Sequence, residues 1–196
     1  MNTLPHLRKS VRTQRQQLPP DTIMSASHSI AEKIFSLNEF QNAQHVAFYA
    51  AQENEVDLSV LFYHVLSSNK TPYLPIFSEK NEKCLSFSRI DRQTKFKKNK
   101  WGIDEPLMND DTLIETVELD VIFLPLVMFD AQCHRVGRGR GCYDRCLQFA
   151  LNKTKNTRPT LIGLAYEFQK VETIVPQSWD VEMDFVMTEV RVYVRQ

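Results

Sequence analysis

The feature that most constrains the fold is an alternation of two hydrophobic periods along the chain. Residues 45–51 form a short, continuous apolar run, residues 57–68 carry apolar side chains at helical spacing, and residues 71–77 are again strand-like. Continuous apolar runs are typical of strands buried on both faces, as in a parallel sheet. Further runs over 120–126 and 160–164 extend the pattern. The alternation predicts an α/β fold with a mostly parallel central sheet that is covered by helices.

Helical and loop segments surround this alternation. Residues 4–17 place apolar side chains at helical spacing before a Pro-Pro pair, which predicts an amphipathic helix. We expect Asp21 to cap a second helix that runs to about Leu37. The remaining expectations are an antiparallel strand over 84–90, a basic loop over 95–100, a glycine loop over 137–141 with a helix over 142–151, and a last strand over 185–193.

Length and charge limit the classes of function. A chain of 196 residues suits one domain, which we expect to span residues 1–196. Its 24 basic and 24 acidic residues give a formal net charge of zero, so it lacks the unbalanced cations that hold nucleic acid through a bulk field. No apolar run reaches the roughly 18 residues of a membrane span. We therefore expect neither a nucleic-acid nor a membrane partner, and any attraction to anions must come from a local cluster.

The N-terminal segment and the cysteines indicate a location. The segment through Pro20 is basic and has no apolar core, which argues against a secretory signal and leaves a transit peptide as the minor alternative. The cysteines show no CxxC spacing and no companion histidine pair, which indicates free thiols in a reducing compartment and argues against a metal site. These are Cys84, Cys133, Cys142 and Cys146. The cytoplasm is the expected location.

The densest motif is the run RVGRGRGCYDR over 135–145, between an expected strand and an expected helix. Glycines let the backbone turn tightly and bring its N–H groups near an anion, and a helix N-terminus adds partial positive charge. Arg138 and Arg140 add planar donor forks that suit phosphate or carboxylate. The spacing fits neither a Walker loop nor a dinucleotide fingerprint. Its position favours phosphate binding over an ordinary flexible turn or a solvent-facing Arg-Gly tract.

Acidic residues near this motif could hold a divalent cation. Asp144 lies at the head of the expected helix, where it is either a capping carboxylate or a ligand for Mg²⁺ held against phosphates. Asp180 and Asp184 supply further carboxylates before the last strand. Their four-residue spacing would place them on one face of a helix, although such a pair is usually solvated surface.

Other candidate positions lie outside the glycine-rich run. Arg8 and Arg12 are one helical turn apart, with Arg15 beyond, and form either a solvated basic face or a cation pair for a triphosphate. Glu55 follows a buried strand, where open α/β sheets bind ligands, although a surface acid would look the same. Trp101 is either a core aromatic or a stacking platform for a flat heterocycle.

In order and spacing over nearly the whole chain, these segments resemble the 5-formyltetrahydrofolate cyclo-ligase family, also called methenyltetrahydrofolate synthetase. The resemblance rests on RKSVR at 8–12, EVD at 55–57, WGI at 101–103, the glycine-rich run through Asp144, and the acidic stretch 180–189. It implies a three-layer α/β/α fold. It also implies ATP- and Mg²⁺-dependent cyclisation of 5-formyltetrahydrofolate to 5,10-methenyltetrahydrofolate, through a phosphorylated formyl group, with release of ADP and phosphate. The partners are then small molecules, and we expect a monomer.

The resemblance implies a role for each matching residue. The ATP-binding set is Arg8, Lys9, Ser10, Val11, Arg12, Arg135, Val136, Gly137, Arg138, Gly139, Arg140, Gly141, Cys142 and Tyr143. The folate-binding set is Ala50, Glu55, Trp101, Arg138, Gly139, Arg140, Gly141 and Cys142. Arg138, Arg140 and Tyr143 would take part in catalysis. Asp144 with Asp180, or with Asp184 in its place, would hold Mg²⁺.

Some positions depart from the family pattern. Cys142 stands where the family commonly has a tyrosine, Arg8 where lysine is frequent, and Trp179 where a smaller polar residue or histidine is usual. Two alternatives to the cyclo-ligase therefore stay open. One is a protein of the same fold that binds folate or nucleotide with impaired turnover. The other is an RNA-binding module that uses the basic segments 8–15 and 135–145.

Overall fold

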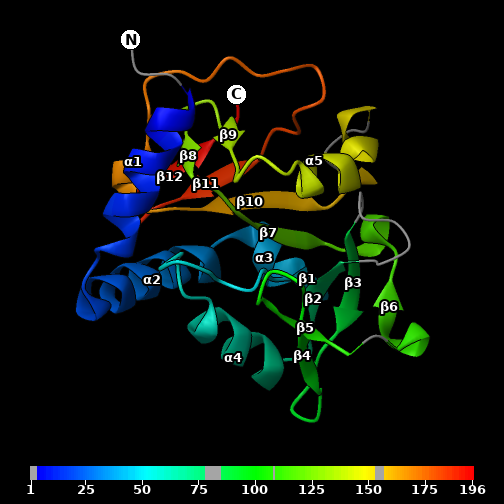
Figure 1. Ribbon diagram of the computed structural model, residues 1–196. Coiled ribbons are helices and arrows are strands. Elements are labelled where there is room, and N and C mark those ends of the chain that lie inside the picture. Colours follow the sequence, from blue (N-terminus) through cyan, green and yellow to red (C-terminus); the bar gives the residue numbers. More distant parts are fainter. Residues whose placement is uncertain (1–3, 78–84, 108, 153–156) are drawn as a thin grey trace.

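A computed structural model describes residues 4–77, 85–107, 109–152 and 157–196. Within these residues the chain forms one eight-stranded sheet in the order β12-β11-β10-β7-β1-β2-β3-β6 (Figure 1). The strands are β1 (His45–Ala47), β2 (Thr71–Phe77), β3 (Leu85–Arg89), β6 (Leu113–Ile114), β7 (Val121–Pro125), β10 (Thr160–Leu164), β11 (Phe185–Met187) and β12 (Val192–Val194). From β11 to β2 all neighbours are parallel, and antiparallel strands complete both edges.

Helices cover both faces of this sheet, which confirms the expected three-layer α/β/α fold. On one face lie α2 (Pro20–Phe35), α3 (Asn38–Asn42) and α4 (Ser59–Ser67). On the other lie α5 (Cys142–Cys146), the 3₁₀ helix η3 (Gln148–Asn152) and the irregular segment before β11, so that α4 and α5 flank opposite sides of the sheet in Figure 1. Strand β7 is buried and contributes to the hydrophobic cores on both faces of the sheet. Phe123 packs into the core under α2, α3 and α4, and Ile122 packs into the core on the side of α5.

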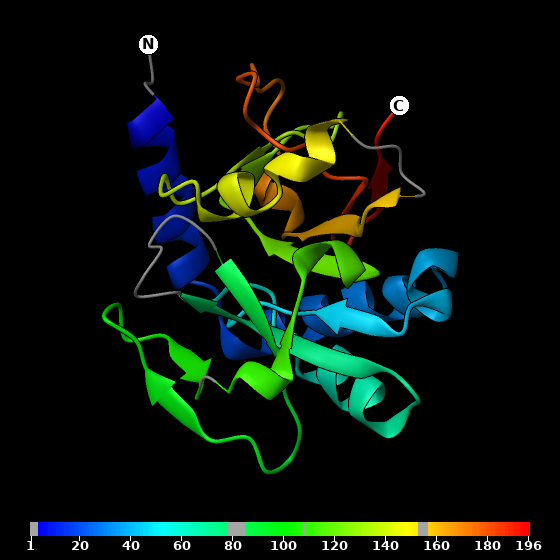
Figure 2. The same ribbon diagram turned by 90° about the vertical axis from the view of Figure 1, so that its right-hand side faces the viewer.

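Helix α1 (Leu4–Gln16) stands apart from these layers (Figure 2). Its apolar stripe, Leu7 and Val11, packs on a small cluster that includes Met128 and Val136. Those two residues belong to the hairpin of β8 (Met128–Phe129) and β9 (Arg135–Val136). Because β8 follows β7 closely, α1 lies across the carboxyl ends of the central strands.

A second hairpin and three short 3₁₀ helices complete the described elements. The hairpin pairs β4 (Phe96–Lys98) with β5 (Asp104–Pro106). The 3₁₀ helices are η1 (Asp110–Thr112), η2 (Thr116–Glu118) and η5 (Glu167–Gln169). No helix in the described part of the chain is long and apolar enough to cross a bilayer.

The strands expected over 71–77 and 160–164 are confirmed with the same bounds, and the antiparallel strand over 84–90 is β3, with Cys84 outside the described residues. The run over 45–51 pairs as a strand only through Ala47. The single strand expected over 185–193 is wrong. There the chain reverses between β11 and β12, because the Thr188 hydroxyl accepts the backbone N–H groups of the next turn.

Three smaller expectations are also corrected. The basic loop over 95–100 contains strand β4, since β5 returns beside it and supplies backbone partners. Asp21 does not cap α2: the N-cap is Pro19, with no side-chain bond, and Pro20 starts the helix with its fixed φ. The helix over 142–151 stops at Cys146 and continues as the 3₁₀ helix η3.

Candidate active site

A large cavity, with a volume of about 1070 Å³, lies where the predicted site residues meet. From β1 the chain adds β2 on one side, and from β7 it adds β10 on the other, so the order in which parallel strands are added reverses between β1 and β7. Open α/β sheets bind ligands at such a switch point, beyond the carboxyl ends of the strands. The cavity wall includes Ala50, Pro125 and Leu126, which follow β1 or end β7.

The glycine-rich run forms a bend along one side of this cavity, and all of its residues from Arg135 to Arg145 line it. The bend needs glycine at two places, because Gly139 and Gly141 have φ values of 93° and 62°. Gly141 is also the N-cap of α5. A Cβ atom at Gly139 would lie 3.9 Å from Nη1 of Arg8, so the bend lies close to helix α1. An ion pair between Arg135 and Asp144 spans the bend.

Two guanidinium groups facing the cavity carry unused donors. The Nε atoms of Arg8 and Arg135 are buried and have no hydrogen-bond partner within the described residues. Both side chains line the cavity, from α1 and from the start of the bend respectively. A buried N–H without an acceptor is costly, whereas an anionic ligand would supply one.

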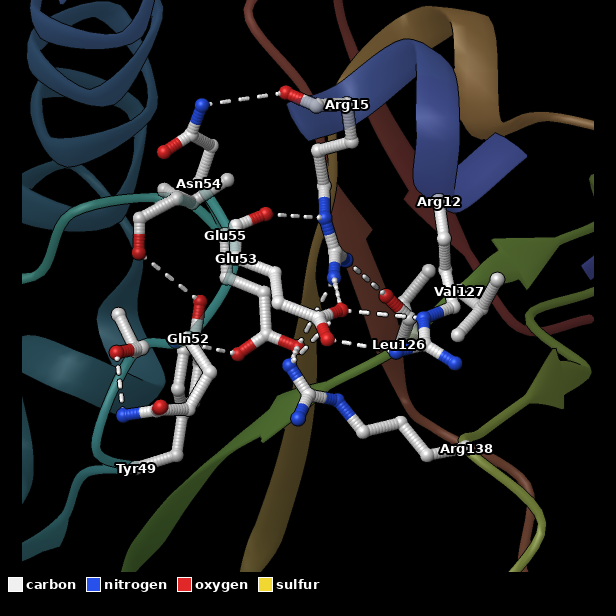
Figure 3. A network of polar contacts seen from close by, with 12 residues as sticks. Arg12, Arg15, Tyr49, Gln52, Glu53, Asn54, Glu55, Leu126, Val127 and Arg138 are labelled. Atoms are coloured by element: carbon white, nitrogen blue, oxygen red, sulfur yellow. Dashed lines mark hydrogen bonds and ion pairs between the residues drawn. The ribbon is translucent and has the colours of Figure 1, made fainter. Parts of the chain in front are cut away.

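Opposite the bend, Glu55 is buried in a cluster of cations (Figure 3). Its Oε1 accepts hydrogen bonds from Nη2 of Arg138 at 3.1 Å and from Nη2 of Arg15 at 3.4 Å. Its Oε2 accepts the backbone N–H of Gln52 at 3.0 Å. Burial raises the pKa of Glu55, and both arginines oppose that shift by stabilising the carboxylate. Glu55 thus joins the bend to α1 through Arg138 and Arg15.

Glu53, two residues earlier, forms a second contact with the same helix. Nε and Nη2 of Arg12 donate to its two oxygens at 3.0 and 2.5 Å. Glu53 and Asn54 have φ values of 52° and 57°, a left-handed conformation that is strained for residues with a side chain. Hydrogen bonding from Arg12 lowers the pKa of Glu53. The turn therefore aims two carboxylates into one group of arginines.

Aromatic side chains form a third part of the wall. The Trp101 ring meets the Phe77 ring edge-on, with centroids 4.5 Å apart, and the guanidinium of Arg140 lies 4.3 Å from its centre. Burial, with the Glu55 carboxylate adding to it, raises the pKa of the Tyr143 phenol well above its ordinary value of 10. Tyr143 is therefore protonated at neutral pH and can donate a hydrogen bond.

The candidate metal ligands separate into two groups. Asp144 and Asp180 both line the cavity, although Asp144 pairs with Arg135 and Asp180 accepts the Gln177 backbone N–H. The described residues hold no cluster of three or more potential ligands. Mg²⁺ commonly takes only one or two protein carboxylates and completes its shell with substrate phosphates and water. Asp144 and Asp180 fit that requirement.

Asp184 does not. Segment 180–184 is not helical, so the expected shared face with Asp180 is wrong. Asp184 is buried and bonds Arg158 through both carboxylate oxygens, at 2.7 and 2.8 Å, and it also accepts the backbone N–H of Leu161. Its role is structural. Among the described cysteines, Cys133, Cys142 and Cys146 are free thiols, and Cys84 lies outside that part of the chain.

Most residues predicted for the site line the cavity, and besides Asp184 three do not. Lys9 and Ser10 are exposed and do not line it, while Val11 packs in the small apolar cluster under α1. Glu53 also lines the cavity and was given no role by the sequence reasoning. Arg15, named there only beyond the Arg8–Arg12 pair, has a side chain that is 1% exposed and contacts Glu53 and Glu55. The spacing of Arg8, Arg12 and Arg15 places Arg15 on the same helical face, but it does not show that this side chain is buried.

Known proteins resemble this chain in sequence and in fold. Residues 1–189 match the family model described as the 5-formyltetrahydrofolate cyclo-ligase family. The chain is 33% identical to 5-formyltetrahydrofolate cyclo-ligase of Haemophilus influenzae, over 90% of this chain and 92% of that protein. It is 27% identical to that of Escherichia coli K12, over 93% and 98%. The NMR structure of Aquifex aeolicus 5,10-methenyltetrahydrofolate synthetase is similar, with a TM-score of 0.81 and 30% identity over 97% of this chain and 91% of that one.

Proposed function

This chain belongs to the 5-formyltetrahydrofolate cyclo-ligase family, and we propose that it uses MgATP to cyclise 5-formyltetrahydrofolate to 5,10-methenyltetrahydrofolate, releasing ADP and phosphate. We propose further that the enzyme acts in the cytoplasm as a monomer on these small molecules.

The chemistry requires activation of a poor leaving group. A formamide oxygen does not leave readily, so the γ-phosphoryl group first moves from ATP to that oxygen, and the bond to ADP breaks. N10 of the folate then attacks the formyl carbon. The carbon–oxygen bond breaks as phosphate departs, and N10 loses its proton. The protein's task is to position the reactants and to stabilise charge, as in other phosphoryl transfers.

One observation carries the assignment of the phosphate site. The buried Nε atoms of Arg8 and Arg135, two residues that line the same cavity, lack acceptors within the described residues, and the glycine-rich bend lies beside them. A triphosphate between α1 and the bend would satisfy both. Arg138 and Arg140 would then follow the charge as it moves toward the formyl oxygen, and the protonated Tyr143 would donate a hydrogen bond to it.

The folate would occupy the other side of the cavity. Glu55 is buried, and we assign it the pterin N–H groups, because a carboxylate fixed at both oxygens is a rigid acceptor. Trp101, backed by Phe77, offers a flat surface to the rest of the ligand, with Ala50 on the same wall. Asp144 and Asp180 would hold Mg²⁺, which supplies charge neutralisation at the phosphates.

The deciding experiment is spectrophotometric. Purified protein is incubated with 5-formyltetrahydrofolate, ATP and Mg²⁺, while the methenyl absorbance and ADP are followed together. We expect one ADP for each methenyl product, and neither without ATP or Mg²⁺. Binding of ATP and folate without product would instead support the impaired-turnover alternative, in which Cys142 has removed activity. Displacement of ATP by RNA at physiological salt would support the RNA-binding alternative.

A further inference from the structure

The carboxylate of Glu53 contacts Arg12, which lines the cavity and which the family resemblance gives to ATP, and Arg138, which the proposed function places beside the phosphates (Figure 3). Arg12 holds both of its oxygens, and Nη2 of Arg138 lies 3.6 Å from Oε2. We propose that Glu53 is a positioning residue that holds Arg12 and Arg138 in the free enzyme and is exchanged for the phosphates when ATP binds. This inference rests on the proposed function, because it takes the triphosphate as the competing anion.

Glu53 is negatively charged, like the phosphates with which it would compete for Arg12. The Arg12 hydrogen bond holds its pKa below the ordinary value of 4.5, so the side chain is an anion at neutral pH. One guanidinium fork can bind a carboxylate or a phosphate in the same bidentate way. Arg12 cannot present its Nε–Nη2 edge to both anions at once. ATP must therefore displace Glu53 or bind against its negative charge.

The turn that carries Glu53 is fixed, so only the side chain needs to move. Nε of Arg15 donates to the Glu53 carbonyl at 3.0 Å, and the Asn54 side chain donates to the Gln16 carbonyl at 3.1 Å. The Tyr166 hydroxyl donates to the Asn54 carbonyl at 3.1 Å. These bonds anchor the left-handed backbone to α1 and to the loop after β10. Exchange is then a rotation of one side chain within a rigid frame.

Glu55 and Glu53 differ in solvent exposure, which a ligand needs in order to replace a carboxylate. The Glu55 side chain is 5% exposed and its second oxygen is held by a backbone N–H, so it stays in place. The Glu53 side chain is 26% exposed, and its partner Arg12 is 39% exposed. Ion pairs that solvent can reach are weak and exchange readily. Of the two carboxylates, Glu53 is the one a ligand can replace.

Removing the carboxylate should strengthen ATP binding. Apparent affinity falls with the fraction of protein in which the binding groups are occupied by another partner. For a solvent-accessible ion pair of ordinary strength, we expect the Kd for ATP of Glu53→Gln to be about fivefold lower than that of the parent. Glu53→Asp keeps the charge and should stay nearer the parent value. Glu172→Gln removes one exposed negative charge just outside the cavity wall, and it should change the Kd little.

Isothermal titration calorimetry with ATP, and separately with inorganic tripolyphosphate, tests the proposal on variants of the whole 196-residue chain. Tighter binding of both ligands by Glu53→Gln but not by Glu172→Gln, with a lower KM for ATP and a smaller change in kcat, is the expected result. A Kd equal to or above that of the parent overturns the proposal. Glu53→Gly has the same expected sign and suits the φ of 52°, so it replaces the glutamine variant should that one not fold.

The outcome also separates this inference from the proposed function. If the parent protein binds ATP and its glutamine variant binds no tighter, only the exchange by Glu53 is wrong. If the parent binds neither ATP nor tripolyphosphate, the assignment of the cavity to a nucleotide is wrong, and the exchange fails with it.

Discussion

Arg138 is the cation that links the bend to Glu55, on the proposed folate side of the cavity. Its Nη2 contacts Glu55 at 3.1 Å, and its position in the bend places it beside the proposed phosphates. We expect Arg138→Ala to lower kcat/KM through a loss of roughly 2–4 kcal/mol of transition-state stabilisation, the range for removing one preorganised donor. Steady-state kinetics with each substrate varied in turn provides the measurement. Parent-like kcat/KM for both substrates would remove Arg138 from the site.

The two glutamates of the turn give opposite pH responses. The pKa of Glu53 is lowered, so its contribution to stability is present above pH 4.5 and is lost as the pH falls through its lowered pKa. The pKa of Glu55 is raised by burial, so the stability it contributes is present below pH 4.5 and is lost as the pH rises through its raised pKa.

Glu53→Gln should therefore flatten the acid side of the stability profile. Below pH 4.5 the parent loses the free energy of the Arg12 pair as Glu53 takes up a proton, whereas the variant has no such proton to bind. Urea unfolding at a series of pH values measures the difference. Parallel profiles for parent and variant would show that the Arg12 pair adds no stability.

At the residue scale, sequence reasoning succeeds where a motif is local. The glycine-rich bend, Arg8 and Arg12 reach the cavity as expected. Arg15 and Glu53 are harder to predict, because their roles depend on contacts between residues about forty positions apart. In the sequence, Arg15 looks like one more cation on a solvated helical face. In the structure it is buried and contacts both Glu53 and Glu55, because α1 packs over the turn after β1.

At the scale of elements, the bend depends on two positive φ values. Gly141→Ala places a side chain at φ 62° and brings its Cβ to 3.0 Å from Nη1 of Arg145. We expect it to lower the free energy of unfolding by roughly 1–2 kcal/mol, the cost of a left-handed residue with a side chain. Gly137→Ala is the matched control, because nothing lies within 4 Å of its added Cβ and its φ is not positive. Equal thermal shifts for the two variants would contradict the conformational argument.

Buried parallel strands are the elements best predicted from this sequence. Strands β2 and β10 read as continuous apolar runs because both of their faces are covered. The elements that were predicted wrongly depend on pairing between segments, which the local sequence pattern does not show. Strand β4 is wholly exposed and exists because β5 lies beside it, and the turn after β11 is closed by Thr188 with neither glycine nor proline to mark it.

At the scale of the whole molecule, the buried Arg158–Asp184 pair lies at the opposite ends of the strands from the cavity. Asp184 bonds the backbone of β10 and also Nη2 of Arg195, after β12, so it ties three strands together. Removing one partner of a buried ion pair costs about 3–5 kcal/mol. We expect Asp184→Asn to lower the unfolding free energy by that order and to leave the Mg²⁺ dependence of the folded enzyme unchanged.

Asp144→Asn provides the matched comparison. Its carboxylate faces the cavity, so we expect slow turnover at saturating Mg²⁺ with a smaller loss of stability. Chemical denaturation and Mg²⁺ titration of activity, run on both variants, separate the two roles. A shifted Mg²⁺ dependence in Asp184→Asn would return Asp184 to the metal site, and parent-like turnover in Asp144→Asn would remove Asp144 from it.

The whole cavity is arranged, in our account, to move one phosphoryl group onto the formyl oxygen. Labelling that oxygen with a heavy isotope and analysing the released phosphate by mass spectrometry tests this most directly. The account predicts that each phosphate formed with a methenyl product carries one labelled oxygen, because the formyl oxygen leaves bound to phosphorus. Unlabelled phosphate, formed at the same rate as product, would contradict it.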